Sequence, residues 1–274
     1  MTAVHSGSDP VPAWRSVVDL SDRFEWVDGS VRLKSIERRT TSSASGKAPS
    51  ALQRWLVRFI YADQNSSRTV SRGLAPVLAR LDDASAWGVN LGAGDTTLHS
   101  RLLNLDIYDG PGVHFVCRGD DLPLRSASLA CVLSQEVLEH VPDPDACVRE
   151  VERVLAPGGL FYLQLPFIIG YHPGPNDYWR FTREGIRELL AKERWEIIDS
   201  DVVLEGASGF YRIAVEFVAV LVAAISRRLY RPAKAATAIA LWPIKLLDPI
   251  MRRSPERDRI PGGYWVLARR RPTL

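Results

Sequence analysis

The chain has 274 residues, of which 46% are hydrophobic and 24% charged, and its formal net charge is +3. These values describe an ordinary globular protein with one large domain and additions, and they exclude a strongly charged chain. From Ser226 onward, twelve Lys and Arg residues outnumber three Asp and Glu residues, so the rest of the chain is net negative. A basic end can meet nucleic acid, an anionic membrane or only solvent, and the lack of interleaved aromatic residues makes nucleic acid an unlikely partner.

The three cysteines, Cys117, Cys131 and Cys147, fall within expected strands or a helix and have no metal-ligand spacing. We therefore expect free core thiols in a reducing cytoplasm, and we predict no metal ligands. Residues Met1–Pro10 lack the basic start and apolar run of a secretory signal. The expected location is the cytoplasm, with peripheral contact to the inner membrane surface as a further option.

The first 49 residues are expected to form a loosely built extension that ends in a Ser/Thr-rich linker, Arg39–Ser50. Within it, Phe24–Leu33 predicts a small hairpin around an Asp-Gly turn. The main domain would span residues 50–274. Its first two helices are expected at Leu52–Ile60, from apolar residues at helical spacing, and at Val70–Leu81.

Alternating helices and apolar runs predict a mostly parallel sheet. Helices are expected over Asp143–Leu155 and from Thr182 onward. The expected strands are, in order, Trp87–Leu91, Leu102–Ile107, Val113–Cys117, Leu129–Ser134, Leu160–Leu165, Trp195–Leu204 and Gly263–Ala268. Only Asp95–Arg101 separates a glycine turn from the second strand. A parallel crossover usually needs a dozen or more residues, so this one is expected to be a short helix or a bare loop.

Short motifs follow the expected strands in a fixed order: Gly92-Ala93-Gly94, Asp106, Asp120-Asp121-Leu122-Pro123, Leu138-Glu139-His140, and Glu150 with Arg153-Val154-Leu155-Ala156-Pro157-Gly158-Gly159. Over Ala86 to about Leu190, this order resembles the class I S-adenosylmethionine-dependent methyltransferases, in particular the methyltransferase type 11 domain group. The resemblance implies a Rossmann-like α/β fold. Its seven-stranded sheet would be mostly parallel with an antiparallel last strand, and helices would cover both faces.

The resemblance also implies S-adenosylmethionine as the cofactor. Asp106 would take the ribose hydroxyls, and Asp120 the adenine amino group, with Asp121 as the fallback. Two positions depart from the common pattern, because Asn90 and Thr96 stand where many relatives have an acidic residue and a glycine. The full set of expected cofactor-binding residues is Asn90, Gly92, Gly94, Asp106, Asp120, Asp121, Leu122 and Gln135.

Four residues are candidates for catalysis: His140, His172, Asp177 and Arg180. The last three lie in Tyr171–Thr182, which resembles the Pro-x-Asp-x-x-Arg-Phe-Thr segment of one subgroup of these enzymes. This segment is rich in His, Asp, Arg and aromatic residues, so it is expected to close over the site. His140 follows the Leu138-Glu139 turn and would lie on the acceptor side. The alternatives are structural: a helix-capping contact for His140 and an ion pair of Arg180 with Asp177 or Glu184.

Residues Phe210–Arg259 form an insert before the last expected strand. It holds two apolar segments, Ile213–Ile225 and Ala235–Ile250, that are flanked by basic residues and too short to span a bilayer easily. An interfacial segment on a membrane would show this pattern. A helical pair packed over the sheet, or across a dimer interface, would show it too, and the oligomeric state is left open.

The favoured function is a methyltransferase acting on oxygen of a small or lipid-linked acceptor. A nicotinamide oxidoreductase is disfavoured because Thr97 replaces the third glycine of its fingerprint. From another class, the alternative is a catalytically lapsed cofactor-binding scaffold or a membrane-docked interaction protein.

Overall fold

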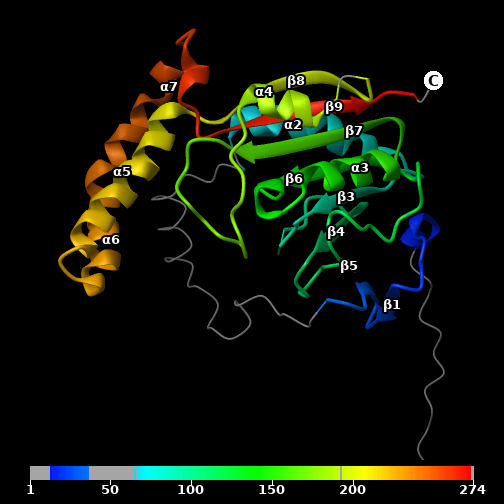
Figure 1. Ribbon diagram of the computed structural model, residues 1–274. Helices are drawn as coiled ribbons and strands as arrows, with labels where there is room; N and C mark the ends of the chain where they lie inside the picture. The colour runs from blue at the N-terminus through cyan, green and yellow to red at the C-terminus, as the bar shows by residue number, and fades with distance from the viewer. Residues whose placement is uncertain (1–12, 37–64, 66, 95, 192, 273–274) are drawn as a thin grey trace, which may run out of the picture.

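The computed structural model describes residues 13–36, 65, 67–94, 96–191 and 193–272. Within these ranges, nine strands form one sheet in the order β1-β2-β5-β4-β3-β6-β7-β9-β8 (Figure 1). Neighbouring strands from β2 to β7 are parallel, and β9 runs antiparallel to β7 and β8. The strand bounds are β1 Phe24–Val27, β2 Ser30–Leu33, β3 Gly88–Leu91, β4 Leu102–Asp106, β5 Phe115–Val116, β6 Leu129–Gln135, β7 Leu155–Pro166, β8 Trp195–Leu204 and β9 Gly263–Arg270.

The strand order reverses at β3, which lies between β4 and β6. From β3 the chain first moves outward through β4 and β5, and it then returns to β6 and continues the other way through β7. In open sheets of this kind, ligands bind outside the carboxyl ends of the strands at the reversal. The fold therefore points to the ends of β3, β4 and β6.

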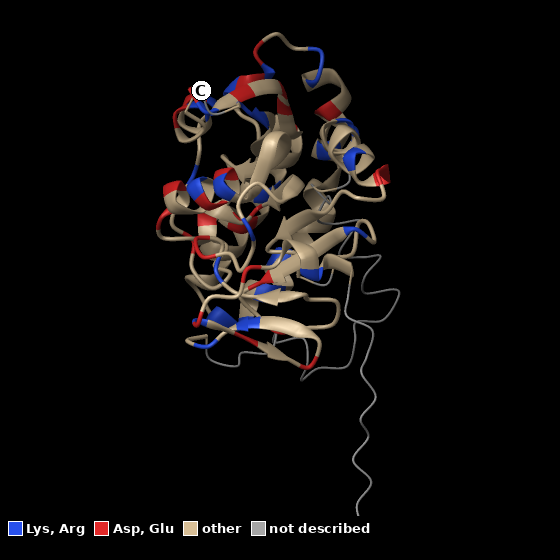
Figure 2. Ribbon diagram, turned by 90° about the vertical axis from the view of Figure 1, so that its right-hand side faces the viewer, with Lys and Arg blue, Asp and Glu red and all other residues tan. Residues whose placement is uncertain are grey.

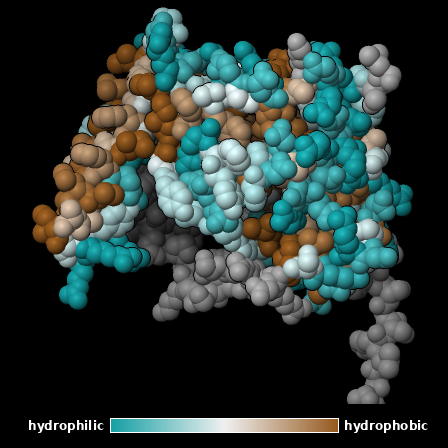
Figure 3. All heavy atoms as spheres, in the orientation of Figure 1, coloured by the Kyte–Doolittle hydropathy of each residue, from teal (hydrophilic) through white to brown (hydrophobic). Residues whose placement is uncertain are grey.

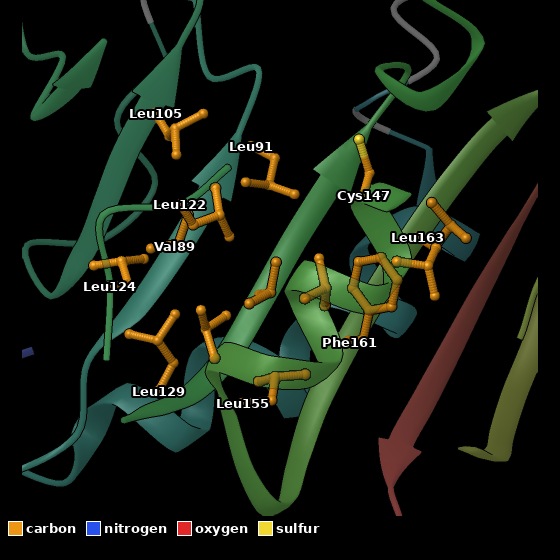
Figure 4. Close-up of a cluster of buried hydrophobic side chains, with 14 of the residues drawn as sticks. Val89, Leu91, Leu105, Leu122, Leu124, Leu129, Cys147, Leu155, Phe161 and Leu163 are labelled. Atoms are coloured by element: carbon orange, nitrogen blue, oxygen red, sulfur yellow. The ribbon is translucent and has the colours of Figure 1, made fainter. Parts of the chain in front are cut away.

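Helices cover both faces of the sheet. On one face, α3 (Pro144–Val154) and α4 (Arg183–Leu189) pack against the core shown in Figure 4, where Leu91, Leu105, Phe161 and Leu163 converge. On the other, α2 (Arg68–Ala79), followed by η4 (Arg80–Asp82), packs on a second cluster built around Tyr162 and Trp265. The side chains of β3, β4 and β6 are buried almost throughout, which explains their nearly continuous apolar runs.

The first described segment belongs to the sheet. A short helix, η1 (Ala13–Val17), precedes the β1–β2 hairpin, whose turn residues Asp28 and Gly29 have φ of 48° and 84°. Two consecutive positive φ angles match the right-handed twist of a tight hairpin, so the Asp-Gly prediction is confirmed. The sequence did not indicate that β2 would pair in parallel with β5, which makes the sheet two strands wider than expected. The expected linker and the Leu52–Ile60 helix lie outside the described residues.

The remaining boundaries follow local chemistry. Asp143 caps α3 by accepting the Ala146 N–H, and Thr182 caps α4 by accepting the Gly185 N–H, as their sequence positions predict. The described residues between Gly92 and Arg101 contain no helix, so the described part of the first crossover is a bare loop, one of the two expected forms. Strand β7 begins at Leu155, five residues earlier than expected, because Leu155 pairs with Leu129 before the Pro-Gly-Gly turn.

The insert between β8 and β9 is helical. Its elements are α5 (Gly206–Ala223), η6 (Arg227–Leu229), α6 (Tyr230–Leu241), η7 (Trp242–Leu247), α7 (Asp248–Met251) and η8 (Arg257–Arg259). Helices α5 and α6 lie side by side and extend away from the sheet (Figure 1), sharing a small cluster of Tyr211, Val215 and Ala238. Within the described part of the chain, α5 alone is long and apolar enough to cross a bilayer by length and composition, and 39% of it is buried.

Candidate active site

A cavity of about 610 Å³ opens at the carboxyl ends of β3, β4, β5 and β6, where the strand order reverses. This volume lies in the range that small-molecule and cofactor sites occupy. Its lining includes Gly92, Asp106, Asp120, Glu136 and His140. The strand ends that the sequence predicted to form the site therefore do surround this cavity. Some of the residues predicted to bind the cofactor, however, are not part of its lining.

Asp106 is held in a fixed orientation at the cavity wall. Its Oδ2 accepts the Gly94 N–H at 2.9 Å and its Oδ1 accepts the Tyr108 N–H at 3.0 Å. Each carboxylate oxygen has a further lone pair, so a neighbouring diol can still donate to both. Gly92 has φ +60°, and a Cβ at this position would lie 2.5 Å from Val137 Cγ2. The turn thus requires glycine for its backbone conformation and for its close approach to the next loop.

The loop after β5 is organised by ion pairs that sequence reasoning missed. Arg118 donates two hydrogen bonds to Asp120, at 2.8 and 2.6 Å, and holds the pKa of that carboxyl below its usual range. Asp121 pairs with Arg23 at 2.8 Å and lines a separate hollow beside the N-terminal hairpin. Of the two carboxylates, Asp120 is therefore the one that lines the large cavity.

The Leu122 amide is already occupied. It donates to Glu150 Oε2 at 3.1 Å, and Glu150 pairs with Arg153 at 2.8 Å. The same guanidinium donates to the carbonyls of Leu122 and Leu124, at 3.0 and 2.6 Å. The Glu-x-x-Arg part of the motif thus fixes the loop after β5 against α3. The Leu122 N–H can shape the adenine side of the site, but it has no free hydrogen for a ligand.

Two expected cofactor residues lie in the sheet rather than in the cavity lining. Asn90 is buried within β3, between β4 and β6. Gln135 ends β6, and its Nε2 lies 3.4 Å from Gln164 Oε1 on β7. Gly94 has φ +51° and serves the site through its N–H on Asp106. Their roles toward a ligand stay predictions.

Glu136, which directly follows β6, lines the cavity and was not singled out from the sequence. Its φ is +58°, a conformation that non-glycine residues rarely adopt. Burial, together with the nearby Glu139 charge, raises the pKa of Glu136 to about 7, although Gln164 Nε2 donates to its carboxylate at 3.2 Å. A strained residue with a carboxyl that titrates near neutrality is typical of functional sites.

Beside the cavity, Glu139 lies between two histidines. Its side chain is fully buried, and its Oε1 is 3.6 Å from Nε2 of His140 and 3.6 Å from Nε2 of His172. The two imidazole rings meet edge to face at 5.1 Å. Sequence reasoning placed His140 on the acceptor side and His172 in the segment Tyr171–Thr182, and the structure brings the two together. The structure also adds Glu139, which the sequence motif contained but no spacing argument selected.

Asp177 and Arg180 form a clamp within the segment after β7. Arg180 donates to Asp177 at 2.5 and 2.6 Å, and Asp177 also accepts the His172 N–H at 2.9 Å. Arg180 holds the pKa of the Asp177 carboxyl down at about 2. The segment is tied to the η5 turn (Leu138–His140) by the Tyr178 N–H, which donates to the Glu139 carbonyl at 2.7 Å. The expected catalytic pair thus positions His172, and neither residue lines the cavity.

Comparison with known proteins identifies the class of this domain. Residues 74–163 match the family described as a methyltransferase domain. A protein of Mycolicibacterium smegmatis (strain ATCC 700084 / mc(2)155), described as "Probable S-adenosylmethionine-dependent methyltransferase/", is 37% identical over 93 residues, which cover 32% of this chain and 36% of that protein. The chain thus matches about a third of the length of this relative.

The chain is also similar to solved structures, at low sequence identity. A Burkholderia thailandensis 1,6-didemethyltoxoflavin-N1-methyltransferase covers 83% of this chain and 94% of its own at 17% identity, with a TM-score of 0.42. A Methanosarcina mazei SAM-dependent methyltransferase covers 73% and 99% at 15% identity, with a TM-score of 0.44. These values are too low to transfer a substrate, so the assignment rests on the strand order and the matched family.

The match over residues 74–163 and the sheet order support a class I, S-adenosylmethionine-dependent methyltransferase assignment for this part of the chain. The expected fold class and the expected methyltransferase class are thereby confirmed. The residues present fit the cofactor, because the cavity is large enough and Asp106 offers two oriented oxygens beside a glycine turn.

Proposed function

We propose that the protein transfers the methyl group of S-adenosylmethionine to a hydroxyl oxygen of a small or lipid-linked acceptor. One observation carries the proposal: a single cavity has the anchored Asp106 carboxylate in its wall together with Glu136 and His140. Asp106 and the turn at Gly92 would hold the cofactor. Glu136 and His140 come from the next loop along the reversal and would face the acceptor.

When bound, the cofactor supplies an already activated methyl group on a sulfonium. The tasks left to the chain are to align the acceptor, to exclude water and to accept a proton from a hydroxyl. We assign proton acceptance to Glu136, because its carboxyl lines the cavity and has a pKa near neutral pH. The oxygen preference follows from this assignment, since a sulfonium methyl needs such a base when the acceptor is a hydroxyl.

The cofactor assignment is tested by binding. Isothermal titration with S-adenosylmethionine should give one site per chain, and Asp106→Asn should weaken it by about 1–3 kcal/mol, the cost of leaving buried polar partners unpaired. Asp121→Asn is the matched control, because its carboxylate pairs with Arg23 away from the large cavity. Equal affinity in wild type and Asp106→Asn would place the ribose elsewhere.

Turnover separates the enzyme from a lapsed scaffold. Labelled-methyl transfer should be screened against lipid and aqueous fractions of cell extract, and a labelled product lost in Glu136→Gln is the expected result. A protein that binds the cofactor but labels neither fraction would support the scaffold.

We further propose that the insert, residues 210–259, docks on an anionic membrane surface and brings the site to a lipid-linked acceptor, which would locate the protein at the inner membrane face. Large apolar side chains are exposed along its helices, including Phe217 at 66%, Ile225 at 83% and Ile239 at 67%. Figure 3 shows this apolar surface along the α5–α6 edge. Basic residues lie among them: Arg227, Arg228, Arg231, Lys234, Lys245, Arg252 and Arg253.

The position of the insert supports this role. It leaves the sheet after Leu204 and returns at Gly263, and Gly263 pairs with Pro166 at the carboxyl end of β7. The insert therefore projects from the same edge of the sheet at which the cavity opens. A surface that the insert touches would face the site. By contrast, acidic and basic residues are interspersed over the side seen in Figure 2, which gives no support for nucleic acid as a partner.

Flotation with anionic and neutral vesicles tests the docking. We expect flotation with anionic vesicles that decreases at high salt, since arginines near such a surface contribute on the order of 1 kcal/mol each. Phe217→Ser combined with Leu221→Ser should abolish it. Ile197→Ser with Ile198→Ser, which changes exposed apolar residues on β8, is the control. Flotation that is absent in wild type, or the same in both double variants, would contradict the proposal.

A further inference from the structure

Glu139 is a buried carboxylate without a hydrogen-bond donor among the described residues. Its side chain is 0% exposed, and neither Oε1 nor Oε2 has a hydrogen-bond partner there. A buried carboxylate is costly unless it is paired or coordinates a cation. The Nε2 atoms of His140 and His172 each lie 3.6 Å from Oε1. The hydrogen bonds of the described residues therefore do not offset the charge of the Glu139 carboxylate.

A backbone carbonyl lies against Nδ1 of each histidine. His140 Nδ1 lies 2.5 Å from the Asn176 carbonyl, and His172 Nδ1 lies 3.2 Å from the Gly170 carbonyl. A carbonyl oxygen only accepts, so His140 Nδ1 carries the hydrogen. His172 Nδ1 also lies 3.4 Å from Arg180 Nη2, which only donates, and the shorter contact with the Gly170 carbonyl favours the same tautomer for His172. In the neutral rings, both Nε2 lone pairs then face the Glu139 carboxylate. Three electron-pair donors directed at one another repel unless a cation or extra protons lie between them.

The spacing of these atoms suits one metal ion. Nε2 of both histidines and a Glu139 oxygen all lie within 4.8 Å of one another. The 3.6 Å separations exceed a direct hydrogen bond. Two ligands at roughly 2.0–2.1 Å from a tetrahedral ion would lie roughly 3.4 Å apart. The Glu139–histidine pairs at 3.6 Å are already close to this separation, and the two Nε2 atoms, which lie within 4.8 Å of each other, would move closer together. Imidazoles whose other nitrogen donates to a carbonyl are the usual arrangement around protein-bound metals.

We propose that Glu139, His140 and His172 form a binding site for a divalent transition-metal ion, with Glu139 and both Nε2 atoms as its ligands. Two imidazoles and one carboxylate suit Zn²⁺, Fe²⁺ or Co²⁺, whereas Mg²⁺ prefers oxygen ligands. Three protein ligands leave the ion an open position, which is the arrangement of a catalytic rather than a structural site. His140 lines the large cavity, so the proposed site borders it, whereas Glu139 and His172 are not part of its lining.

The surrounding contacts hold the ligands in place. Asp177 accepts the His172 N–H, and the Arg180 guanidinium donates to the Gly170 carbonyl that also meets His172 Nδ1. Asp177 and Arg180 are therefore positioning residues for the second histidine. This explains why the clamp exists although neither residue lines the cavity.

Metal titration of the full chain tests the site without cofactor or acceptor. Protein freed of metal by a chelator should bind one equivalent of Zn²⁺ in competition with a chromophoric chelator, and Co²⁺ should give visible d–d absorption. Excess Mg²⁺ should not compete. Glu139→Gln and His172→Asn should weaken Zn²⁺ binding by more than the roughly 10- to 100-fold cost of losing an outer-shell partner. His99→Ala is the control, because His99 lies outside the cluster and its Nδ1 accepts the Arg101 N–H.

Wild-type stoichiometry decides the question even if a variant folds poorly. Less than one bound equivalent in the wild type would mean that protons alone neutralise Glu139, and it would overturn the proposal. Binding that persists in folded Glu139→Gln, as judged by circular dichroism, would overturn it too. Use of the ion to orient an acceptor oxygen would rest on the proposed methyl transfer. Because Zn²⁺ and S-adenosylmethionine are titrated separately, either assignment can fail alone.

Discussion

Replacing Asp177 by Asn should destabilise the folded chain by about 2 kcal/mol. The carboxylate is 1% exposed and accepts two charge-assisted hydrogen bonds from Arg180. Its pKa of about 2, against a usual 3.8, corresponds to about 2 kcal/mol in favour of the charged form. Asn has nearly the same shape but removes that charge, so the loss should approach this value.

The matched control is Asp120→Asn. Asp120 meets Arg118 with the same paired geometry, at 2.8 and 2.6 Å, but the Arg118 side chain is 54% exposed. Exposed pairs of this kind contribute about 0–1 kcal/mol. Urea unfolding at pH 7 without cofactor, followed by tryptophan fluorescence, should therefore separate the two variants by more than about 1 kcal/mol. Amide exchange of residues 167–182 would detect the same loss if this segment opens on its own.

The stabilisation by Asp177 should also depend on pH in a predictable direction. Because the folded-state pKa of Asp177 is depressed, its stabilisation is present above about pH 4 and is lost as the pH falls toward 2. The difference between wild type and Asp177→Asn should narrow over that interval. Equal losses in Asp177→Asn and Asp120→Asn at pH 7 would refute the argument from burial.

Three further substitutions give expected outcomes. Gly92→Ala should lower the melting temperature more than Gly94→Ala, because both have positive φ but a Cβ meets a side chain only at Gly92; equal shifts would contradict this. Arg153→Lys should cost about 1–3 kcal/mol in urea unfolding, since the two carbonyls and the carboxylate it binds lose a fixed fork of donors, whereas exposed Arg149→Lys should change little. Methyl transfer should rise with pH through about 7 as Glu136 loses its proton, and Glu136→Gln should reduce the rate by roughly 10²–10⁴-fold with cofactor affinity retained. A flat profile would exclude Glu136 as the base.

Local pattern predicted most of the sheet. The buried runs at β3, β4 and β6 and the returning strand β9 were all visible, because a strand covered on both faces must be apolar throughout. The pairing of β2 with β5 was not visible, since it depends on backbone hydrogen bonds between residues about 80 positions apart, such as the Val31 N–H on the His114 carbonyl.

The candidate site was predictable only in part for the same reason. Asp106 follows its strand directly, so its place at the cavity could be read from order alone. The partners of Asp120 and Leu122 could not be predicted in this way. Arg118 donates to the Asp120 carboxylate and Glu150 accepts the Leu122 N–H, and these contacts form only in the folded chain. The surroundings of Glu139 could not be predicted either, because His172 comes from the segment after β7 and lies beside Glu139 only in the folded chain.

The two ends of the helical insert meet in space. The Gly262 N–H donates to the Leu204 carbonyl at 2.8 Å, and Gly263 pairs with Leu204 where the chain re-enters the sheet. These contacts set the register of β8 against β9 without any contribution from the residues of the insert. A segment of different length or surface chemistry could be spliced between these two points without shifting β8 or β9. The length and surface chemistry of the insert can therefore vary independently of the residues around Asp106 and Glu136.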